Sequence, residues 1–252
     1  MKTQERIYNR KYGDSALRDI QINHPLFRSF FERIVDILLR YDKKKILELG
    51  CGQGILAYCL KDKNVEYTGI DISSAGIESI RKLVKNNKFK FLSGNVEEIS
   101  INDKFDIIFC KDLLHHLKNP LDVLNKFRKN LNPDGLFIAF EANPLNPQFI
   151  FLNTLAITRE IYYYRTTNSY LKEIFTRSGF EIIDNYRYSV FPYDLIISVK
   201  YSPLRHANFL MEKKNIDKIV HFDNFFSNSL MNMFSSYNIV VAKNSNDKGI
   251  KH

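Results

Sequence analysis

Cysteine and long apolar runs are scarce in this sequence. No apolar stretch approaches the roughly 20 residues that span a bilayer, and residues 1–13 are polar, without the apolar segment of a signal peptide. The three cysteines, Cys51, Cys59 and Cys110, are odd in number and lack the paired spacing of a metal site. We therefore expect a cytoplasmic protein with no bound metal and no membrane span.

Acidic residues are outnumbered by basic ones, and the formal net charge is +9. Residues 1–45 alone carry 11 Lys and Arg against 6 Asp and Glu. A basic chain favours nucleic acid, an anionic lipid surface or an acidic substrate, but a solvated lysine-rich surface produces the same excess. No internal repeat and no signature of an RNA- or DNA-binding module is present. We favour the solvated surface, so nucleic acid is not an expected partner, while a peripheral membrane contact stays open.

Residues 45–71 are the most informative part of the chain. A short apolar run at 46–49 stops at a glycine, which is typical of a buried parallel strand. Three glycines then stand at every second position: Gly50, Gly52 and Gly54. Glycine tolerates positive φ and lets a ligand approach the backbone. Helical spacing resumes at 55–60, so the turn opens a helix whose free N–H groups favour polar or anionic ligand groups.

An acidic residue follows the glycine turn at the end of the next apolar run. This residue, Asp71, stands 17 residues after Gly54, and a carboxylate there can accept hydrogen bonds from both hydroxyls of a ribose. The G-x-G-x-x-G fingerprint of nicotinamide and flavin sites does not fit, because its third glycine would fall on Ile55. A structural glycine-rich turn in another α/β protein is the alternative.

The glycine turn after a strand ending Leu-Glu-Leu, followed by Asp71, resembles the class I S-adenosylmethionine (SAM)-dependent methyltransferases, of the small-molecule type similar to methyltransferase domains 11 and 25. The resemblance implies that SAM is the cofactor and S-adenosylhomocysteine (SAH) its product. It implies cofactor contacts from the residues Glu48, Gly50, Cys51, Gly52, Gly54, Asp71, Ile72, Asn95, Val96, Cys110 and Lys111. Asn95 departs from the family, which usually has an acidic residue there to accept a hydrogen bond from the adenine amino group. Its amide oxygen can still accept one, without the charge.

The length of 252 residues and a hydrophobic fraction of 44% suit one large α/β domain. The resemblance implies a doubly wound, Rossmann-like α/β fold, with a seven-stranded, mostly parallel sheet of order 3-2-1-4-5-7-6 and an antiparallel strand 7. We expect the strands at 45–49, 66–70, 88–93, 105–110, 136–140, 180–188 and 237–242. Residues 1–243 would form a single domain with three additions and a tail: a loosely ordered arm at 1–25, cap insertions at 143–166 and 191–236, and a disordered tail at 244–252.

Local signals set several helix ends. A packing helix follows His24-Pro25, and capping side chains precede three further helices: Ser73 or Ser74, Asn119 before Pro120, and Thr167 or Asn168. Asn132-Pro133-Asp134-Gly135 has the composition of a turn before strand 5.

The candidate catalytic residues follow strands 4 and 5. The Leu-His-His run at 114–116 resembles the motif that follows strand 4 in the family, so either His115 or His116 is a candidate general base, with a structural role for both as the alternative. Glu141 ends strand 5, where the methyl acceptor should bind, because open α/β sheets bind ligands at the carboxyl ends of their strands. It is a candidate acceptor contact, or it caps neighbouring backbone.

The expected activity is methyl transfer from SAM to a small, apolar or lipid-like acceptor. Six apolar residues share one helical face in the second insertion, with Asp223 on the other side: Phe222, Phe225, Phe226, Leu230, Met233 and Phe234. We expect this stripe, together with the aromatic residues 162–164, to line the acceptor pocket, or else to pack on the sheet as core. The alternatives are a SAM-binding regulator without activity, and an RNA methyltransferase that uses the basic arm. The sequence gives no expectation for the oligomeric state.

Overall fold

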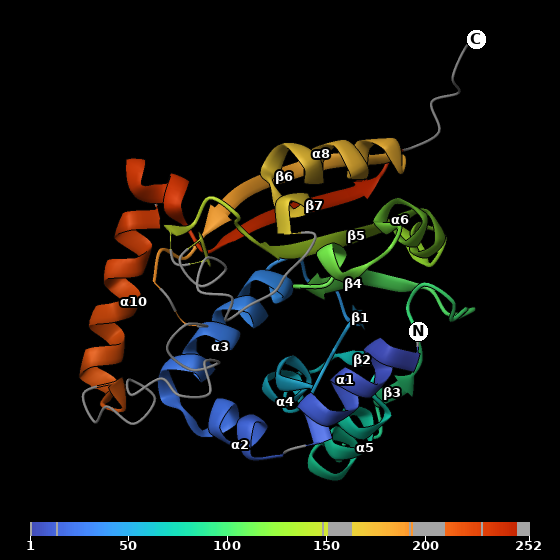
Figure 1. The fold of residues 1–252 in the computed structure, drawn as a ribbon, viewed down its shortest axis with the longest axis horizontal. Coiled ribbons are helices and arrows are strands. Elements are labelled where there is room, and N and C mark those ends of the chain that lie inside the picture. Colours follow the sequence, from blue (N-terminus) through green and yellow to red (C-terminus); the bar gives the residue numbers. More distant parts are fainter. Residues whose placement is uncertain are drawn as a thin grey trace.

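The computed structural model describes residues 2–13, 15–147, 149–150, 163–191, 193, 210–227 and 229–245. Its centre is a seven-stranded sheet built from β1 (Lys45–Leu49), β2 (Glu66–Asp71), β3 (Phe89–Ser93), β4 (Phe105–Lys111), β5 (Leu131–Ala142), β6 (Phe180–Tyr188) and β7 (Tyr237–Asn244). The strand order is β3-β2-β1-β4-β5-β7-β6, and β7 runs antiparallel to both β5 and β6 (Figure 1). The expected fold class, strand order and antiparallel last strand are confirmed.

Helices cover both faces of this sheet (Figure 1). The helices in the described part of the chain are α1 (Lys2–Gly13), α2 (Ser15–Asn23), α3 (Pro25–Leu39), α4 (Ile55–Leu60), α5 (Ser74–Leu83), α6 (Pro120–Arg128), α8 (Asn168–Arg177) and α10 (Lys213–Ser227). The described residues also form short 3₁₀ helices: η1 (Leu114–His116), η2 (Tyr163–Thr166) and η5 (Leu230–Phe234). Among the described helices, none combines the length and the apolar character needed to cross a membrane.

The core consists of two apolar layers, one on each face of the sheet. Successive side chains of β4 enter opposite layers: Ile107 and Phe109 pack with α3, α4 and α5, whereas Ile108 and Cys110 pack with α6 and α8. Strands buried on both faces are nearly continuous apolar runs, and this is why β1 and β4 were recognisable in the sequence. The layers place the carboxyl ends of β1, β2, β4 and β5 along one edge of the sheet.

Two local expectations need correction. The predicted turn at 132–135 lies within β5, where the register with β4 shifts between the pairs Phe105–Leu131 and Ile107–Leu136, so the turn-like residues form a bulge rather than a separate loop. Asn119 does not cap α6: its amide Nδ2 donates to Asp122 Oδ2 at 2.6 Å instead of its oxygen accepting from the backbone. The caps by Ser73 and Thr167 are confirmed.

The N-terminal arm is helical, not loosely ordered. Asn9 on α1 accepts hydrogen bonds from Ser73 Oγ at 3.0 Å and from the Ala75 N–H at 3.2 Å, next to the start of α5. Gln53 Nε2 donates to the backbone oxygen of Tyr12 at 3.1 Å. The arm has little apolar periodicity of its own, so its order depends on these tertiary contacts, which local sequence patterns do not reveal.

The end of the chain also differs from expectation. Asn244 is the last residue of β7, and Ser245 donates to the Gly179 carbonyl from its backbone N–H at 3.2 Å and from its hydroxyl at 2.7 Å. The predicted tail therefore begins two residues too early. Its remaining residues, 246–252, lie outside the described part of the chain, as does Tyr162 of the first insertion.

Candidate functional site

The glycine turn connects β1 to α4 along a left-handed path. Gly50, Gly52 and Gly54 have φ of 75°, 52° and 71°, a region that favours glycine. A Cβ on Gly54 would lie 2.3 Å from Ile80 Cγ1, so this glycine is required for the close packing of α4 on α5. The atoms nearest to a Cβ on Gly52 would belong to the side chain of Tyr12, at 3.4 Å and beyond. Gly54 is therefore structural, while Gly52 faces Tyr12 of the N-terminal arm.

Asp71 holds the glycine turn to the end of β2. Its Oδ2 accepts a hydrogen bond from the Gly52 N–H, and its Oδ1 accepts one from the Ser73 N–H, both at 2.8 Å. The N–H groups of Gly50 and Cys51 donate to the Ile70 carbonyl at 2.8 and 3.0 Å. The predicted cofactor residues of β1 and β2 are thus brought together in one compact unit. A contact between Asp71 and a ribose stays a prediction.

Glu48 lies beneath this unit with its side chain buried. The Tyr67 hydroxyl donates a hydrogen bond to Glu48 Oε2. Burial raises the pKa of Glu48 to about 8, although the Tyr67 hydrogen bond opposes the change; the nearby Asp71 carboxylate adds to it. Glu48 is therefore largely uncharged at neutral pH, and its expected contact with the cofactor stays a prediction.

The predicted adenine-binding residues follow β3. Asn95 Oδ1 accepts from the Glu97 N–H at 3.0 Å, and its Nδ2 donates to Glu98 Oε1 at 3.3 Å. Val96 is buried, and its carbonyl accepts from Lys126 Nζ. Ile72, after β2, is partly exposed. An amide oxygen has two lone pairs, so Asn95 can accept a further hydrogen bond beside its own turn, and its role toward adenine stays a prediction.

The loop after β4 begins with an ion pair. Lys111 Nζ donates to Asp112 Oδ2 and lies 4.7 Å from the centre of the Tyr237 ring. Burial favours the neutral form of Asp112, but Lys111 and the nearby His115 outweigh it, so the pKa of Asp112 lies below its usual value. Asp112 also has a positive φ of 50°, so the backbone turns sharply here. Cys110, just before the loop, is fully buried in the core.

Two polar atoms beside this ion pair are buried without a hydrogen-bond partner among the described residues: Asp112 Oδ1 and the Tyr237 hydroxyl. Tyr237 begins β7, directly opposite Ala142 at the end of β5. Buried polar groups are normally hydrogen-bonded, and the exceptions in native proteins often mark functional positions. Both atoms belong to residues at the edge where the carboxyl ends of β4 and β5 lie.

The three candidate catalytic residues occupy the same edge. Glu141 is fully buried; its Oε1 accepts from the N–H groups of Leu113 and Leu114 at 2.9 and 2.8 Å, and its Oε2 lies 2.8 Å from His115 Nδ1. The ring centres of His115 and His116 are 4.0 Å apart, and that of His116 lies 6.0 Å from Tyr8 on α1. Glu141 thus caps neighbouring backbone, which was the alternative to an acceptor contact. The acceptor contact itself stays untested.

Three residues of this region were not singled out from the sequence. Tyr12 covers Gly52, Asn9 binds the start of α5, and Tyr8 contacts His116. Tyr8 and Tyr12 are four residues apart, so they share a face of α1, with ring centres separated by 5.6 Å. The four-residue spacing of Tyr8 and Tyr12 was the available signal in the sequence, but two residues alone do not predict a helix face in contact with the site.

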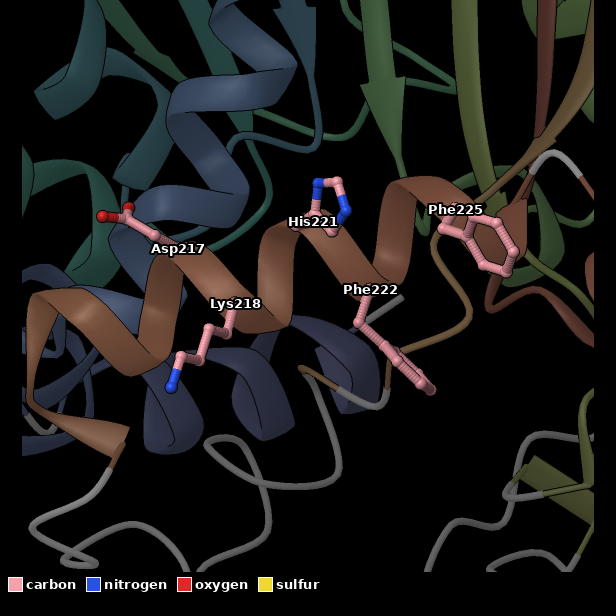
Figure 2. A pocket seen from close by; sticks show the side chains of 5 residues that line it. All are labelled: Asp217, Lys218, His221, Phe222 and Phe225. Carbon is pink, nitrogen blue, oxygen red and sulfur yellow. The ribbon is translucent and has the colours of Figure 1, made fainter.

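The aromatic stripe of the second insertion faces the other way from the prediction. Asp223 is fully buried, whereas Phe222 is 50% and Phe225 65% exposed. These two rings are therefore not core, as the alternative reading had them, while their role in lining an acceptor pocket stays a prediction. Figure 2 shows them extending from α10 along with Asp217, Lys218 and His221, with which they line an open pocket of about 510 Å³ on this helix.

A buried ion pair explains this orientation. Arg33 on α3 donates to Asp223 Oδ2 at 2.9 Å, and Asp223 Oδ1 accepts from the N–H groups of Val190 and Phe191 at 2.7 and 2.9 Å.

Within the described residues there is no group of three His, Cys, Asp or Glu side chains that could hold a metal ion.

Comparisons with known proteins agree with the geometry. Residues 41–179 match the family model of a methyltransferase domain. Over 131 residues the chain is 28% identical to the ubiquinone biosynthesis O-methyltransferase of Actinobacillus pleuropneumoniae serotype 5b (strain L20), which covers 49% of this chain and 55% of that protein. Over 103 residues it is 30% identical to the mitochondrial ubiquinone biosynthesis O-methyltransferase of Schizosaccharomyces pombe, with coverages of 39% and 38%. The chain thus spans about half the length of these curated relatives, or less.

Solved structures show the same fold at low sequence identity. A chain of the complex between the Haloferax volcanii Trm112 methyltransferase activator and the putative methyltransferase has a TM-score of 0.62 at 14% identity, covering 95% of this chain and 98% of that one. The N-methyltransferase NodS from Bradyrhizobium japonicum WM9, solved with SAH, has a TM-score of 0.62 at 11% identity, with coverages of 94% and 97%. With the family model spanning more than half of the sequence and the sheet order as expected, the chain belongs to the class I SAM-dependent methyltransferase family.

Proposed function

We propose that the protein transfers a methyl group from SAM to an oxygen atom of a small, largely apolar acceptor. The observation that carries the proposal is the position of the glycine turn, Asp71 and the pair His115–Glu141 along the carboxyl edge of one sheet. The curated relatives are named as O-methyltransferases, which supports oxygen as the atom that is methylated.

The residues of the glycine turn fit the cofactor. Gly52 is held at positive φ, and a Cβ there would fill the space next to the Tyr12 ring, so a side chain would obstruct a ligand that approaches the backbone. Asp71 supplies acceptor oxygens beside this turn. We assign the amino-acid part of SAM to the turn with Cys110 and Lys111, the ribose to Asp71 and Ile72, and the adenine to Asn95 and Val96. Glu48 supports the turn from below.

When bound, SAM supplies an electrophilic methyl group on a sulfonium, which an acceptor oxygen takes while the bonding electron pair remains on sulfur. The protein has to hold the two reactants in line and exclude water, which is worth roughly 7–11 kcal/mol in well-oriented systems. His115 or His116 removes the acceptor proton. Asp112 Oδ1 and the Tyr237 hydroxyl, which lack partners among the described residues, are available to bind the acceptor's polar group.

The two insertions, 143–166 and 191–236, would cover the acceptor within a single domain of residues 1–243. The exposed rings of Phe222 and Phe225, beside Lys218, suit contact with a lipid surface that delivers an apolar acceptor. If the protein binds phosphatidylglycerol vesicles and a Phe222→Ser/Phe225→Ser variant does not, the result would support this contact; equal binding by both proteins would exclude it.

Free thiols on all three cysteines are compatible with the proposed cytoplasmic location.

The test of the proposal is transfer of a labelled methyl group. We would incubate the protein with methyl-¹³C SAM and, separately, an alkyl-substituted catechol, an alkyl-substituted phenol, a primary amine and total RNA. The proposal predicts a ¹³C-methoxy product with a hydroxylated acceptor. Label in RNA would establish the RNA methyltransferase alternative, and tight SAM binding without transfer to any acceptor would favour the regulatory one.

A further inference from the structure

The buried carboxylate of Glu141 is tied to one short loop. Its two oxygens receive the Leu113 and Leu114 N–H groups and face the His115 ring, at distances between 2.8 and 2.9 Å. All three partners belong to the turn that leaves β4, while Glu141 itself is the second-to-last residue of the neighbouring strand β5. The sheet therefore holds this loop through the Glu141 side chain, in addition to the Asp112 N–H, which donates to the Phe140 carbonyl at 2.8 Å.

The same contacts favour one nitrogen of His115 as the one that carries the proton. Glu141 Oε1 accepts from two backbone N–H groups, so the carboxylate acts as an acceptor here, and the donor role is assigned to the ring nitrogen that faces its Oε2. That nitrogen is Nδ1, and in a neutral imidazole the lone pair then resides on Nε2. His115 is 5% exposed and cannot easily change its ring orientation.

The loop is also in contact with the glycine turn. A Cβ on Gly50 would lie 3.0 Å from Leu113 Cδ1, so Leu113, whose N–H binds Glu141, packs against the start of the turn. Glu141 thus sets the distance between His115 and the proposed cofactor site. His116 makes ring contacts with His115 and with Tyr8 of the arm.

We propose that Glu141 is a positioning residue that holds His115 in the Nδ1–H tautomer, so that His115 Nε2 is the base that removes the acceptor proton. This inference rests on the proposed function. In the step, the acceptor O–H proton moves to Nε2, the oxygen forms a bond to the methyl carbon, and the carbon–sulfur bond breaks with its electron pair left on sulfur. The imidazolium then releases its proton to water.

The first experiment measures the tautomer directly and needs no acceptor. Nitrogen-15 NMR of the ¹⁵N-histidine-labelled protein, saturated with SAH, should show a protonated Nδ1 and an unprotonated Nε2 for His115, assigned through loss of the signals in His115→Asn. Glu141→Gln should invert this pattern, because the glutamine amide donates toward Nδ1 and the proton moves to Nε2. A proton on Nε2 in the unmodified protein would overturn the proposal, whether or not the variant folds.

The second experiment separates positioning from folding. With an acceptor that the labelled-methyl assay identifies, Glu141→Gln should lower kcat by roughly 10²–10⁴-fold, the range of a positioned general base, with little change in SAM affinity. The double variant with His115→Asn should be no slower than His115→Asn alone, since Glu141 acts through His115. Additive losses, or full activity of Glu141→Gln, would contradict the proposal. Absence of any accepted substrate would defeat the proposed function while the NMR result still decides the tautomer.

Asp106 provides the matched control. Its Oδ2 accepts from the N–H groups of Lys44 and Lys45 at 3.2 and 3.0 Å, and its Oδ1 accepts from Asn132 Nδ2 at 2.7 Å, so it holds two backbone groups and one side chain as Glu141 does. It lies near the amino end of β4, far along the strand from the site. Asp106→Asn should leave both the His115 tautomer and kcat unchanged. A comparable loss in this variant would mean that the effect of Glu141→Gln is structural.

Discussion

The carboxylate of Asp71 accepts a 2.8 Å hydrogen bond from the backbone N–H of Gly52, a residue 19 positions earlier in the chain. Its other oxygen accepts from Ser73 at the start of α5. The end of β2, the glycine turn and the helix after β2 are therefore fixed relative to one another by one side chain. A ligand that binds Asp71 also lies against the turn, which links the two halves of the proposed SAM site.

The first prediction concerns this carboxylate. Asp71→Asn keeps one acceptor oxygen and replaces the other with an NH2 donor, so it loses one of the two backbone hydrogen bonds and an acceptor for the ribose hydroxyls, and the affinity for SAM should fall by about 1–3 kcal/mol. Isothermal calorimetry with SAM measures the change, and NADH should not compete with SAM in the unmodified protein. Unchanged SAM affinity in the variant would place the ribose elsewhere.

The second prediction separates two glycines of the same turn. Gly54→Ala should destabilise the fold, because its Cβ overlaps Ile80 in addition to the strain of positive φ; overpacking of this kind costs about 1–3 kcal/mol. Gly52→Ala should bear only the strain, about 1–2 kcal/mol, yet weaken SAM binding, because its Cβ enters the proposed site. Thermal unfolding and calorimetry on both variants test this. Stronger destabilisation by Gly52→Ala would reverse the roles assigned here.

The sheet and the glycine turn were predictable because their signals are local. The apolar runs of β1 and β4, the glycine spacing and Asp71 depend on residues that are close in the sequence. The order of the N-terminal arm and the orientation of α10 were not predictable, because contacts with residues distant in the sequence determine them. Asn9 accepts a hydrogen bond from Ser73, and Asp223 pairs with Arg33, 190 residues away. A buried, paired aspartate reverses the helix face that hydrophobicity alone would bury. The tie between Glu141 and the His115 loop is likewise invisible until β5 lies beside β4.

The third prediction tests the ion pair that orients α10. Asp223→Ala would leave the buried Arg33 guanidinium and two backbone N–H groups without their acceptor. Removing one partner of a buried pair costs about 3–5 kcal/mol, so the melting temperature should fall strongly. Arg28–Glu32 on α3 is the exposed counterpart, and Glu32→Ala should cost less than about 1 kcal/mol. Equal effects in chemical denaturation would show that α10 is not held by this pair.

The fourth prediction concerns pH and Glu48. Because burial raises its pKa to about 8 in the fold, above the ordinary value of 4.5, the folded protein retains a proton that the unfolded chain releases. The contribution of Glu48 to stability is therefore complete below about pH 4.5, declines as the pH rises toward 8, and is constant above it. Glu48→Gln, which cannot ionise, should remove this part of the pH dependence. Urea unfolding of both proteins between pH 5 and 9 measures it, and identical profiles would contradict the assignment.

SAM binding along the carboxyl edge of β1, β2 and β4 can be tested by a crystal structure of the complex with SAH. We predict the amino-acid part of SAH over Gly50 and Gly52, the ribose hydroxyls within hydrogen-bond distance of Asp71, and the sulfur on the side of the loop that carries His115. SAH bound with its ribose away from Asp71, or at a different edge of the sheet, would exclude this site.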